Sequence, residues 1–284
     1  MTELSYQSRD IPEAGRRAGA ALAVTGLRKS FQRPAVDGLD LAVAPGEFYA
    51  LLGPNGAGKT TTLRIVAGLM QPEAGQVSIF GIDALRDPIT AKRITAWVSD
   101  EPMIYDKLTP LEYLVFVAGL WGITPQIAEA KARDLIRWLD LTAQADDRCE
   151  DFSKGMKQKV ALAGALVHDP KLIILDEPLT GLDARAARLV KDVLKARVQQ
   201  GCSVVMTTHI LEVAERMADR IGLIARGRLI AEGTLGQLRD RVGIGDTSLE
   251  DVFLALTAEQ EPVMPGDPGD PVQDDADRKN AASH

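Results

Sequence analysis

The stretch that decides the fold is Gly53-Pro54-Asn55-Gly56-Ala57-Gly58-Lys59-Thr60, which matches the phosphate-loop pattern Gly-x-x-x-x-Gly-Lys-Ser/Thr. An apolar run at 48–52 precedes it as a buried strand would, and residues 60–69 follow it with the apolar spacing of a helix. Glycines let backbone N–H groups close around phosphate oxygens, and the helix N-terminus adds the positive end of its dipole. The stretch therefore predicts a nucleoside triphosphate site. In that site Lys59 reaches the β- and γ-phosphates, Thr60 ligates Mg²⁺ and Thr61 joins the nucleotide contacts.

Composition limits the kinds of protein this can be. The chain has 284 residues, of which 45% are hydrophobic, so it can bury the core of one large domain or two small ones. Its net charge of -7 offers no general basic surface, and we expect no nucleic acid partner. Cys149 and Cys202 fit neither a disulfide framework nor a metal-ligand spacing, which is typical of a reducing cytoplasm. The longest apolar run, 113–123, is shorter than the roughly 20 residues of a membrane span.

The two ends of the chain differ in composition from its middle. Residues 1–20 are polar, and residues 258–284 are acidic and rich in Pro and Gly, so we expect both to be disordered tails. Between them lies one domain, over 21–257, because the phosphate loop occurs once and no internal repeat is evident. Within it, residues 101–165 read as mainly helical and predict a helical subdomain inserted between sheet elements.

The strands of this domain carry a parallel-sheet pattern. Runs at 172–175, 203–206 and 221–224 are continuously apolar, which is typical of parallel strands covered on both faces. They alternate with helical patterns, so we expect an α/β fold with a mostly parallel sheet.

The first of these strands ends in the acidic pair Asp176-Glu177. A buried carboxylate invites a cation, because an unpaired buried charge is costly. With a phosphate loop upstream, we predict that Asp176 binds or orients Mg²⁺ and that Glu177 polarises the attacking water. The alternative is a pair of strand-end carboxylates that cap the next turn, helped by Pro178.

Further motifs stand in a fixed order around the phosphate loop and the acidic pair. They are Phe31, Phe152-Ser153-Lys154-Gly155-Met156, Thr180-Gly181-Leu182-Asp183 and Thr207-Thr208-His209. With them, the chain resembles the ATPase subunits of ATP-binding-cassette (ABC) transporters over nearly all of 21–257. It is most similar to those of bacterial ABC-2-type exporters of drugs, antibiotics and polysaccharides. The resemblance implies the P-loop ATPase fold of that family, whose mostly parallel core carries an antiparallel β subdomain and a helical subdomain.

The resemblance also implies roles for single residues. Phe31 would stack on the adenine, and His209 would contact the γ-phosphate and hold Glu177 in place. The family forms a head-to-tail dimer, in which Ser153 and Gly155 would face the ATP of the opposite subunit. Asp183 would bridge the two subunits, and the set of motifs on this chain permits a homodimer.

Three positions depart from the family pattern. The stretch Phe152-Ser153-Lys154-Gly155-Met156 corresponds to the family's signature, which usually has Gly and Gln at the positions of Lys154 and Met156. A cation in the first turn of a helix, such as Lys154, opposes the helix dipole. We expect Lys154 to face either the partner's triphosphate or solvent, in a signature that still works. Asp100 stands where the family usually has a Gln that ligates Mg²⁺. A carboxylate is also a hard oxygen donor, so we predict that Asp100 is a Mg²⁺ ligand.

By resemblance, the expected function is ATP hydrolysis that powers transport through separate transmembrane permease subunits, from the cytoplasmic face of the membrane. The family docks its permease near 105–122, where the aromatic and apolar residues fit either a docking surface or the core. Residues 248–257 favour export, because they look like the C-terminal segment of exporter ATPases and read as a capped amphipathic helix. Two alternatives stay open: a soluble ATPase acting on DNA or ribosomes, and a regulatory subunit with weak hydrolysis. The tryptophans are expected to be packing residues only: Trp97, Trp121 and Trp138.

Overall fold

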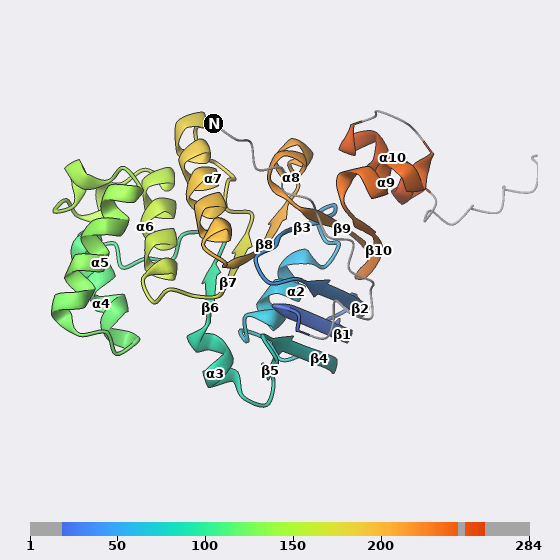
Figure 1. Ribbon diagram of the computed structural model, residues 1–284, viewed down its shortest axis with the longest axis horizontal. Coiled ribbons are helices and arrows are strands. Elements are labelled where there is room, and N and C mark those ends of the chain that lie inside the picture. The colour runs from blue at the N-terminus through green and yellow to red at the C-terminus, as the bar shows by residue number, and fades with distance from the viewer. Residues whose placement is uncertain (1–18, 244–247, 259–284) are drawn as a thin grey trace, which may run out of the picture.

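A six-stranded sheet forms the centre of the fold (Figure 1). The computed structural model describes residues 19–243 and 248–258. The strand order is β10-β9-β3-β8-β7-β6, in which β9 to β6 run parallel and β10 pairs antiparallel with β9. The strands are β3 (Phe48–Leu52), β6 (Thr95–Val98), β7 (Leu172–Asp176), β8 (Ser203–Thr208), β9 (Arg220–Ala225) and β10 (Arg228–Gly233). Every residue of β3, β7 and β8 is buried, which confirms the predicted parallel core.

A second, antiparallel sheet has the order β2-β1-β4-β5. Its strands are β1 (Leu22–Ser30), β2 (Pro34–Val43), β4 (Ala74–Ile79) and β5 (Ile82–Asp83). Helix α2 (Lys59–Val66) buries Leu63, Ile65 and Val66 in one apolar cluster with residues of both sheets. The antiparallel β subdomain is therefore present, as the resemblance implied. The short helix α3 (Pro88–Arg93) connects this sheet to β6.

Three helices lie side by side at one end of the molecule (Figure 1). They are α4 (Pro110–Leu120), α5 (Pro125–Trp138) and α6 (Lys154–Leu166), with 3-10 turns at Thr142–Gln144 and Cys149–Asp151 before α6. Thr109 and Glu112 form a reciprocal capping box at the start of α4. Leu114 and Ala118 are fully buried on one side of α4. Helix α7 (Ala184–Gln199) packs on β8.

The C-terminal helices cover the other end of the central sheet. They are α8 (Leu211–Met217), α9 (Leu235–Val242) and α10 (Leu249–Ala258). Ser248 and Asp251 exchange hydrogen bonds at the start of α10, which confirms the predicted capped helix. Leu249, Val252 and Leu256 are buried in one cluster with residues of β3. The predicted tails, 1–20 and 258–284, lie almost entirely outside the described residues.

A membrane-spanning segment was not expected from the sequence. None of the helices in the described part of the chain is both long enough and apolar enough to cross a bilayer.

Candidate nucleotide site

The phosphate loop joins β3 to α2 in a shape that only glycine allows at two positions. A Cβ on Gly53 would lie 2.3 Å from the backbone oxygen of Ile224, and one on Gly58 would lie 2.2 Å from that of Ala35. Gly58 also has a φ of +105° and immediately precedes the first residue of α2. The helix begins one residue earlier than predicted, at Lys59, and ends three residues earlier, at Val66. The loop is thus wedged between the two sheets, with its backbone free to wrap a phosphate.

The outer side of the loop is open. Pro54, Asn55 and Gly56 are exposed, whereas Ala57 is buried, and Thr61 is half-buried in the first turn of α2. The N–H of Ala57 donates to the carbonyl of Pro54 (3.1 Å), which tightens the turn. The exposed segment is therefore the part of the loop that a nucleotide can reach.

Lys59 is folded back into the phosphate loop. Its side chain is buried, and Nζ donates to the carbonyl oxygens of Gly53 (2.7 Å) and Pro54 (3.2 Å). Burial lowers the pKa of Lys59, while the nearby carboxylates of Glu177 and Asp176 act in the opposite direction. Phosphate oxygens are stronger acceptors than carbonyls for an ammonium group. A bound triphosphate can therefore replace the two carbonyls as the partner of Lys59.

Asp176 is almost fully buried where β7 ends. Its Oδ1 accepts hydrogen bonds from the hydroxyls of Thr60 (3.1 Å) and Thr207 (2.6 Å). Its Oδ2 is buried and has no hydrogen-bond partner among the described residues. A carboxylate with one unpaired oxygen, beside a threonine hydroxyl, is a donor set that fits Mg²⁺.

A metal at this point needs ligands from the nucleotide as well. No group of three or more His, Cys, Asp or Glu side chains in the described part of the chain could hold a metal ion. Mg²⁺ in such sites is commonly held by one or two carboxylates together with substrate phosphates and water. The side chains present therefore suit a metal that binds with the triphosphate.

Glu177 and His209 form a pair beside this carboxylate. Nδ1 of His209 lies 2.9 Å from Oε2 of Glu177, and the Thr180 hydroxyl donates to the same oxygen over 3.4 Å. Glu177 has a φ of +47°, a left-handed conformation that is unfavourable for a side chain of this kind. Its N–H donates to the Thr207 hydroxyl (3.0 Å), which helps to hold that conformation. Glu177, the predicted base, and His209, predicted to hold it in place, thus meet in one hydrogen-bonded pair.

Asp100 and Phe31 are the other residues predicted for this site. Val98 pairs with Leu175 in the parallel register of β6 and β7. Asp176, the last residue of β7, and Asp100, two residues after β6, therefore lie toward the same edge of the sheet. Asp100 is exposed. Phe31 follows β1 and is 61% exposed, which excludes the role of a core residue. The Lys29 ammonium lies 5.8 Å from the centre of its ring.

The signature residues lie in a separate place. Ser153 caps α6 and accepts a hydrogen bond from the N–H of Met156 (3.3 Å). Asp183 caps α7 in the same way, with the N–H of Ala186 as donor (2.8 Å). Ser153, Gly155 and Asp183 together line one cavity of about 600 Å³ between α6 and α7. The structure therefore gathers the predicted residues into two groups, one at the phosphate loop and one at the signature.

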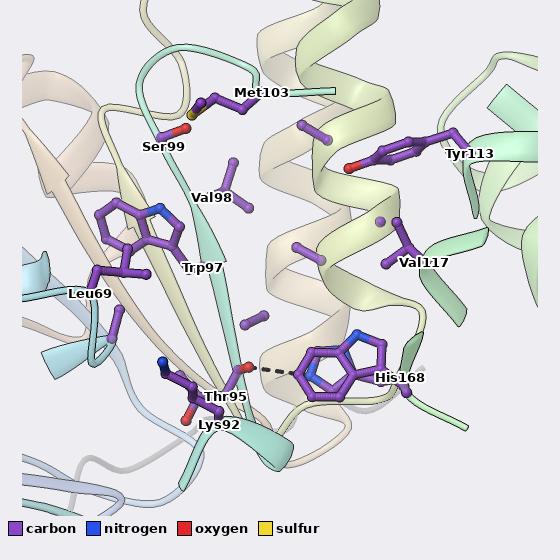
Figure 2. Close-up of a pocket in the computed structure, with 16 residues that line it drawn as sticks. Leu69, Lys92, Thr95, Trp97, Val98, Ser99, Met103, Tyr113, Val117 and His168 are labelled. Carbon is purple, nitrogen blue, oxygen red and sulfur yellow. Dashed lines mark hydrogen bonds between the residues drawn. The ribbon is translucent and has the colours of Figure 1, made fainter. Parts of the chain in front are cut away.

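Sequence reasoning missed a groove of about 360 Å³, which Figure 2 shows, between β6 and the helices α4 and α6. The ring centres of Trp121 and His168 lie 4.1 Å apart in a stacked arrangement, and Trp121 is 39% exposed. The Nε2 of His168 lies 3.2 Å from the Thr95 carbonyl, and burial lowers the pKa of His168. The long apolar run at 113–123 was the available signal in the sequence. Other apolar side chains that line the groove are Leu69, Trp97, Met103, Tyr113 and Val117.

The parallel sheet, the glycine loop and the buried acidic strand end together define a P-loop ATPase. Comparison with known proteins places it more closely: the family model for ABC transporters matches residues 36–180. The chain belongs to the ABC transporter family, as a subunit that binds and hydrolyses ATP.

Relatives with known names and structures cover most of the chain. It is 37% identical to the daunorubicin/doxorubicin resistance ATP-binding protein of Streptomyces peucetius, over 90% of this chain and 78% of the relative. It is 39% identical to a Nod factor export ATP-binding protein of Paraburkholderia xenovorans, over 75% of this chain and 71% of the relative. A solved dimeric ATP-binding cassette, in a post-hydrolysis state with ADP and Pi, superimposes with a TM-score of 0.70 at 26% identity. That match covers 75% of this chain and 98% of the other.

Proposed function

We propose that this chain is the ATPase subunit of an exporter, that two copies work as a dimer, and that it binds the cytoplasmic face of a membrane through a separate permease. The observation that carries the ATPase role is the group around Asp176, with Lys59 and Thr60 on one side and the Glu177–His209 pair on the other. Export is supported by the resistance and export functions in the names of the relatives, and by the capped helix α10.

ATP binding follows from the phosphate loop. The backbone N–H groups at 54–58 and the start of α2 cradle the phosphates, and Lys59 exchanges its loop carbonyls for phosphate oxygens. Thr60, Asp176 and Asp100 would hold Mg²⁺, which neutralises charge on the phosphates when bound. Phe31 offers an exposed aromatic face for the adenine ring.

Hydrolysis is assigned to the Glu177–His209 pair. Glu177 accepts a proton from the attacking water, or orients that water, and His209 fixes the Glu177 carboxylate through their 2.9 Å contact. His209 is half exposed, so its other ring nitrogen can reach the γ-phosphate. The strained backbone at Glu177 is of the kind that persists where function requires it.

The dimer is supported by the separation of the two groups. In one chain, the signature cavity and the phosphate loop lie apart, so Ser153 and Gly155 need the ATP of a second chain to act on. Asp183 lines the same cavity and can bridge the subunits there. The solved cassette with the same fold is dimeric and holds ADP and Pi.

The permease is expected to dock in the apolar groove of Figure 2. Met103 is 84% exposed and Leu69 is 56% exposed, in a lining that is mostly apolar and also includes Lys92, Thr95, Ser99 and His168. Exposed apolar surface of this extent is typical of a protein interaction site. The groove borders β6 and the loop after it, so a docked segment can act on the loop that carries Asp100.

Asp100→Ala tests the metal assignment. We expect the Mg²⁺ concentration for half-maximal ATP hydrolysis to rise by about tenfold, because removal of a carboxylate that supports a metal commonly costs at least that much. The measurement is steady-state hydrolysis across a Mg²⁺ titration at saturating ATP. Glu101→Ala, at the next residue and equally exposed, is the control and should leave the midpoint unchanged. An unchanged midpoint for Asp100→Ala removes Asp100 from the metal site.

Met103→Glu tests the docking groove. We expect the isolated variant to hydrolyse ATP at the parent rate, while its affinity for the permease falls by about 30-fold, as at an interface hot spot. The measurement is the amount of protein retained on washed membranes that contain the permease. Ile127→Glu, on the exposed face of α5, is the matched control. Equal retention of the Met103 variant and the parent would place the permease elsewhere.

A further inference from the structure

Gln158 is a buried polar residue for which the proposed mechanism has no role. It lies in α6, five residues after Ser153, and only 3% of it is exposed. Its Nε2 donates to the backbone carbonyl of Ser99 over 3.4 Å, a long hydrogen bond. Its Oε1 is buried and has no hydrogen-bond partner among the described residues.

The orientation of this amide follows from its neighbour. The Ser99 carbonyl can only accept, so the nitrogen of Gln158 faces it and the oxygen is the unpaired atom. A buried carbonyl without a donor loses its hydration and gains nothing in return, so Gln158 lowers the stability of this fold. An apolar residue of similar size would avoid that loss. Gln158 therefore calls for an explanation other than stability.

The position of Gln158 supplies that explanation. Ser99 immediately precedes Asp100, and Figure 2 shows Ser99 where β6 ends, with Met103 further along the same loop. The neighbouring Lys157 makes a second connection, with Nζ 3.1 Å from a carboxylate oxygen of Asp106. Two consecutive residues of α6 thus hold both ends of the loop over 99–106. The helix that begins at the signature is tied to the loop that carries Asp100.

We propose that Gln158 is a positioning residue that couples the signature helix α6 to the Asp100 loop, and that it is kept at a cost in stability. Movement of α6 when Ser153 engages the partner's ATP is passed through Gln158 to Ser99, and brings Asp100 to the metal. In that state the loop offers backbone N–H groups to Oε1. This proposal rests on the proposed function, because it assigns Asp100 to Mg²⁺ and Ser153 to the opposite ATP.

Gln158→Met is the decisive variant, because methionine has a similar length and no strong hydrogen-bonding group. We expect the Tm to rise by about 2–4 °C, since an unpaired buried oxygen is removed. We also expect the Mg²⁺ midpoint of ATP hydrolysis to rise by about tenfold, while the KM for ATP at saturating Mg²⁺ stays unchanged. Leu162→Met, buried one turn later in α6, is the control for packing and should leave the Mg²⁺ midpoint unchanged.

Lys157→Met provides a second test through the other connection. It is expected to shift the Mg²⁺ midpoint in the same direction, and the Gln158/Lys157 double variant is expected to shift it further. A Gln158→Met protein that unfolds or melts below the parent shows that the residue is structural, and overturns the proposal. A Gln158→Met protein that keeps the parent's Mg²⁺ midpoint also overturns the proposal. Failure of the parent itself to hydrolyse ATP with Mg²⁺ would instead contradict the proposed function.

Discussion

Replacement of Glu177 by Gln is expected to lower kcat for ATP hydrolysis by about 10²- to 10⁴-fold, the contribution of a positioned general base. Gln has the same shape but cannot accept the proton of the attacking water. ATP binding should be unchanged, because the phosphates are held by Lys59 and the loop backbone. Nucleotide affinity and single-turnover hydrolysis, measured on the same preparation, separate these two effects.

The same variant should accumulate as an ATP-bound dimer. We expect hydrolysis to be the event that separates the subunits, so a chain that binds ATP without turnover should stay associated. Light scattering of Glu177→Gln is expected to give a monomer with ADP and a dimer with ATP. Glu212→Gln is the matched control, because Glu212 is an exposed glutamate of α8 that pairs with Arg216. A Glu177→Gln protein that turns over ATP at the parent rate would remove Glu177 from the role of base.

Replacement of Lys59 by Ala is expected to act on binding itself. Lys59 is a buried ammonium group that would pair with the β- and γ-phosphates, and loss of one partner of such a pair costs about 2–4 kcal/mol. That corresponds to about 30- to 1,000-fold in the Kd for ATP. Equilibrium binding of ATP, measured by calorimetry, gives the value directly.

Two comparisons make the Lys59 result specific. Lys195→Ala removes an exposed lysine of α7 and should leave the Kd for ATP unchanged. The thermal stability of the Lys59 variant should stay close to that of the parent, because its loop carbonyls can bind water instead. Unaltered ATP affinity in a folded Lys59→Ala protein would mean that the phosphates bind elsewhere.

Much of the nucleotide site was predictable because its chemistry is local in the chain. The motif is one contiguous stretch of strand, phosphate loop and helix. Steric contact at Gly53 and Gly58 explains why glycine is required at both positions. Asp176 follows an apolar run, so its burial at a strand end could be read directly. The meeting of Glu177 with His209 needed the parallel sheet, in which β7 and β8 end at the same edge.

The groove and the Gln158 connection could not be predicted in the same way. Trp121 and His168 are far apart in the chain and belong to different helical segments, so nothing local indicates that their rings stack. The unpaired oxygen of Gln158 depends on where the loop after β6 runs, which no periodicity encodes. The early end of α2 has a local cause, since Gly68 adopts a left-handed φ of +67°.

Asp100 and Lys154, two of the departures from the family pattern, lie in different surroundings. Asp100 is exposed, so it has room to approach a bound metal from the end of β6. The Lys154 side chain lies against Gly181, where a Cβ would come within 3.4 Å of it. Lys154 is exposed, and its side chain runs along the loop before α7.

The most direct test of the claim that this chain drives transport is its rate of ATP hydrolysis with and without a membrane partner. The chain would be purified from gently solubilised membranes together with the multi-span protein that accompanies it, and the complex returned to lipid vesicles. We predict that the complex hydrolyses ATP several-fold faster than the chain alone, and that Met103→Glu abolishes the difference. Equal rates, with stimulation by nucleic acid or ribosomes instead, would contradict a role in transport.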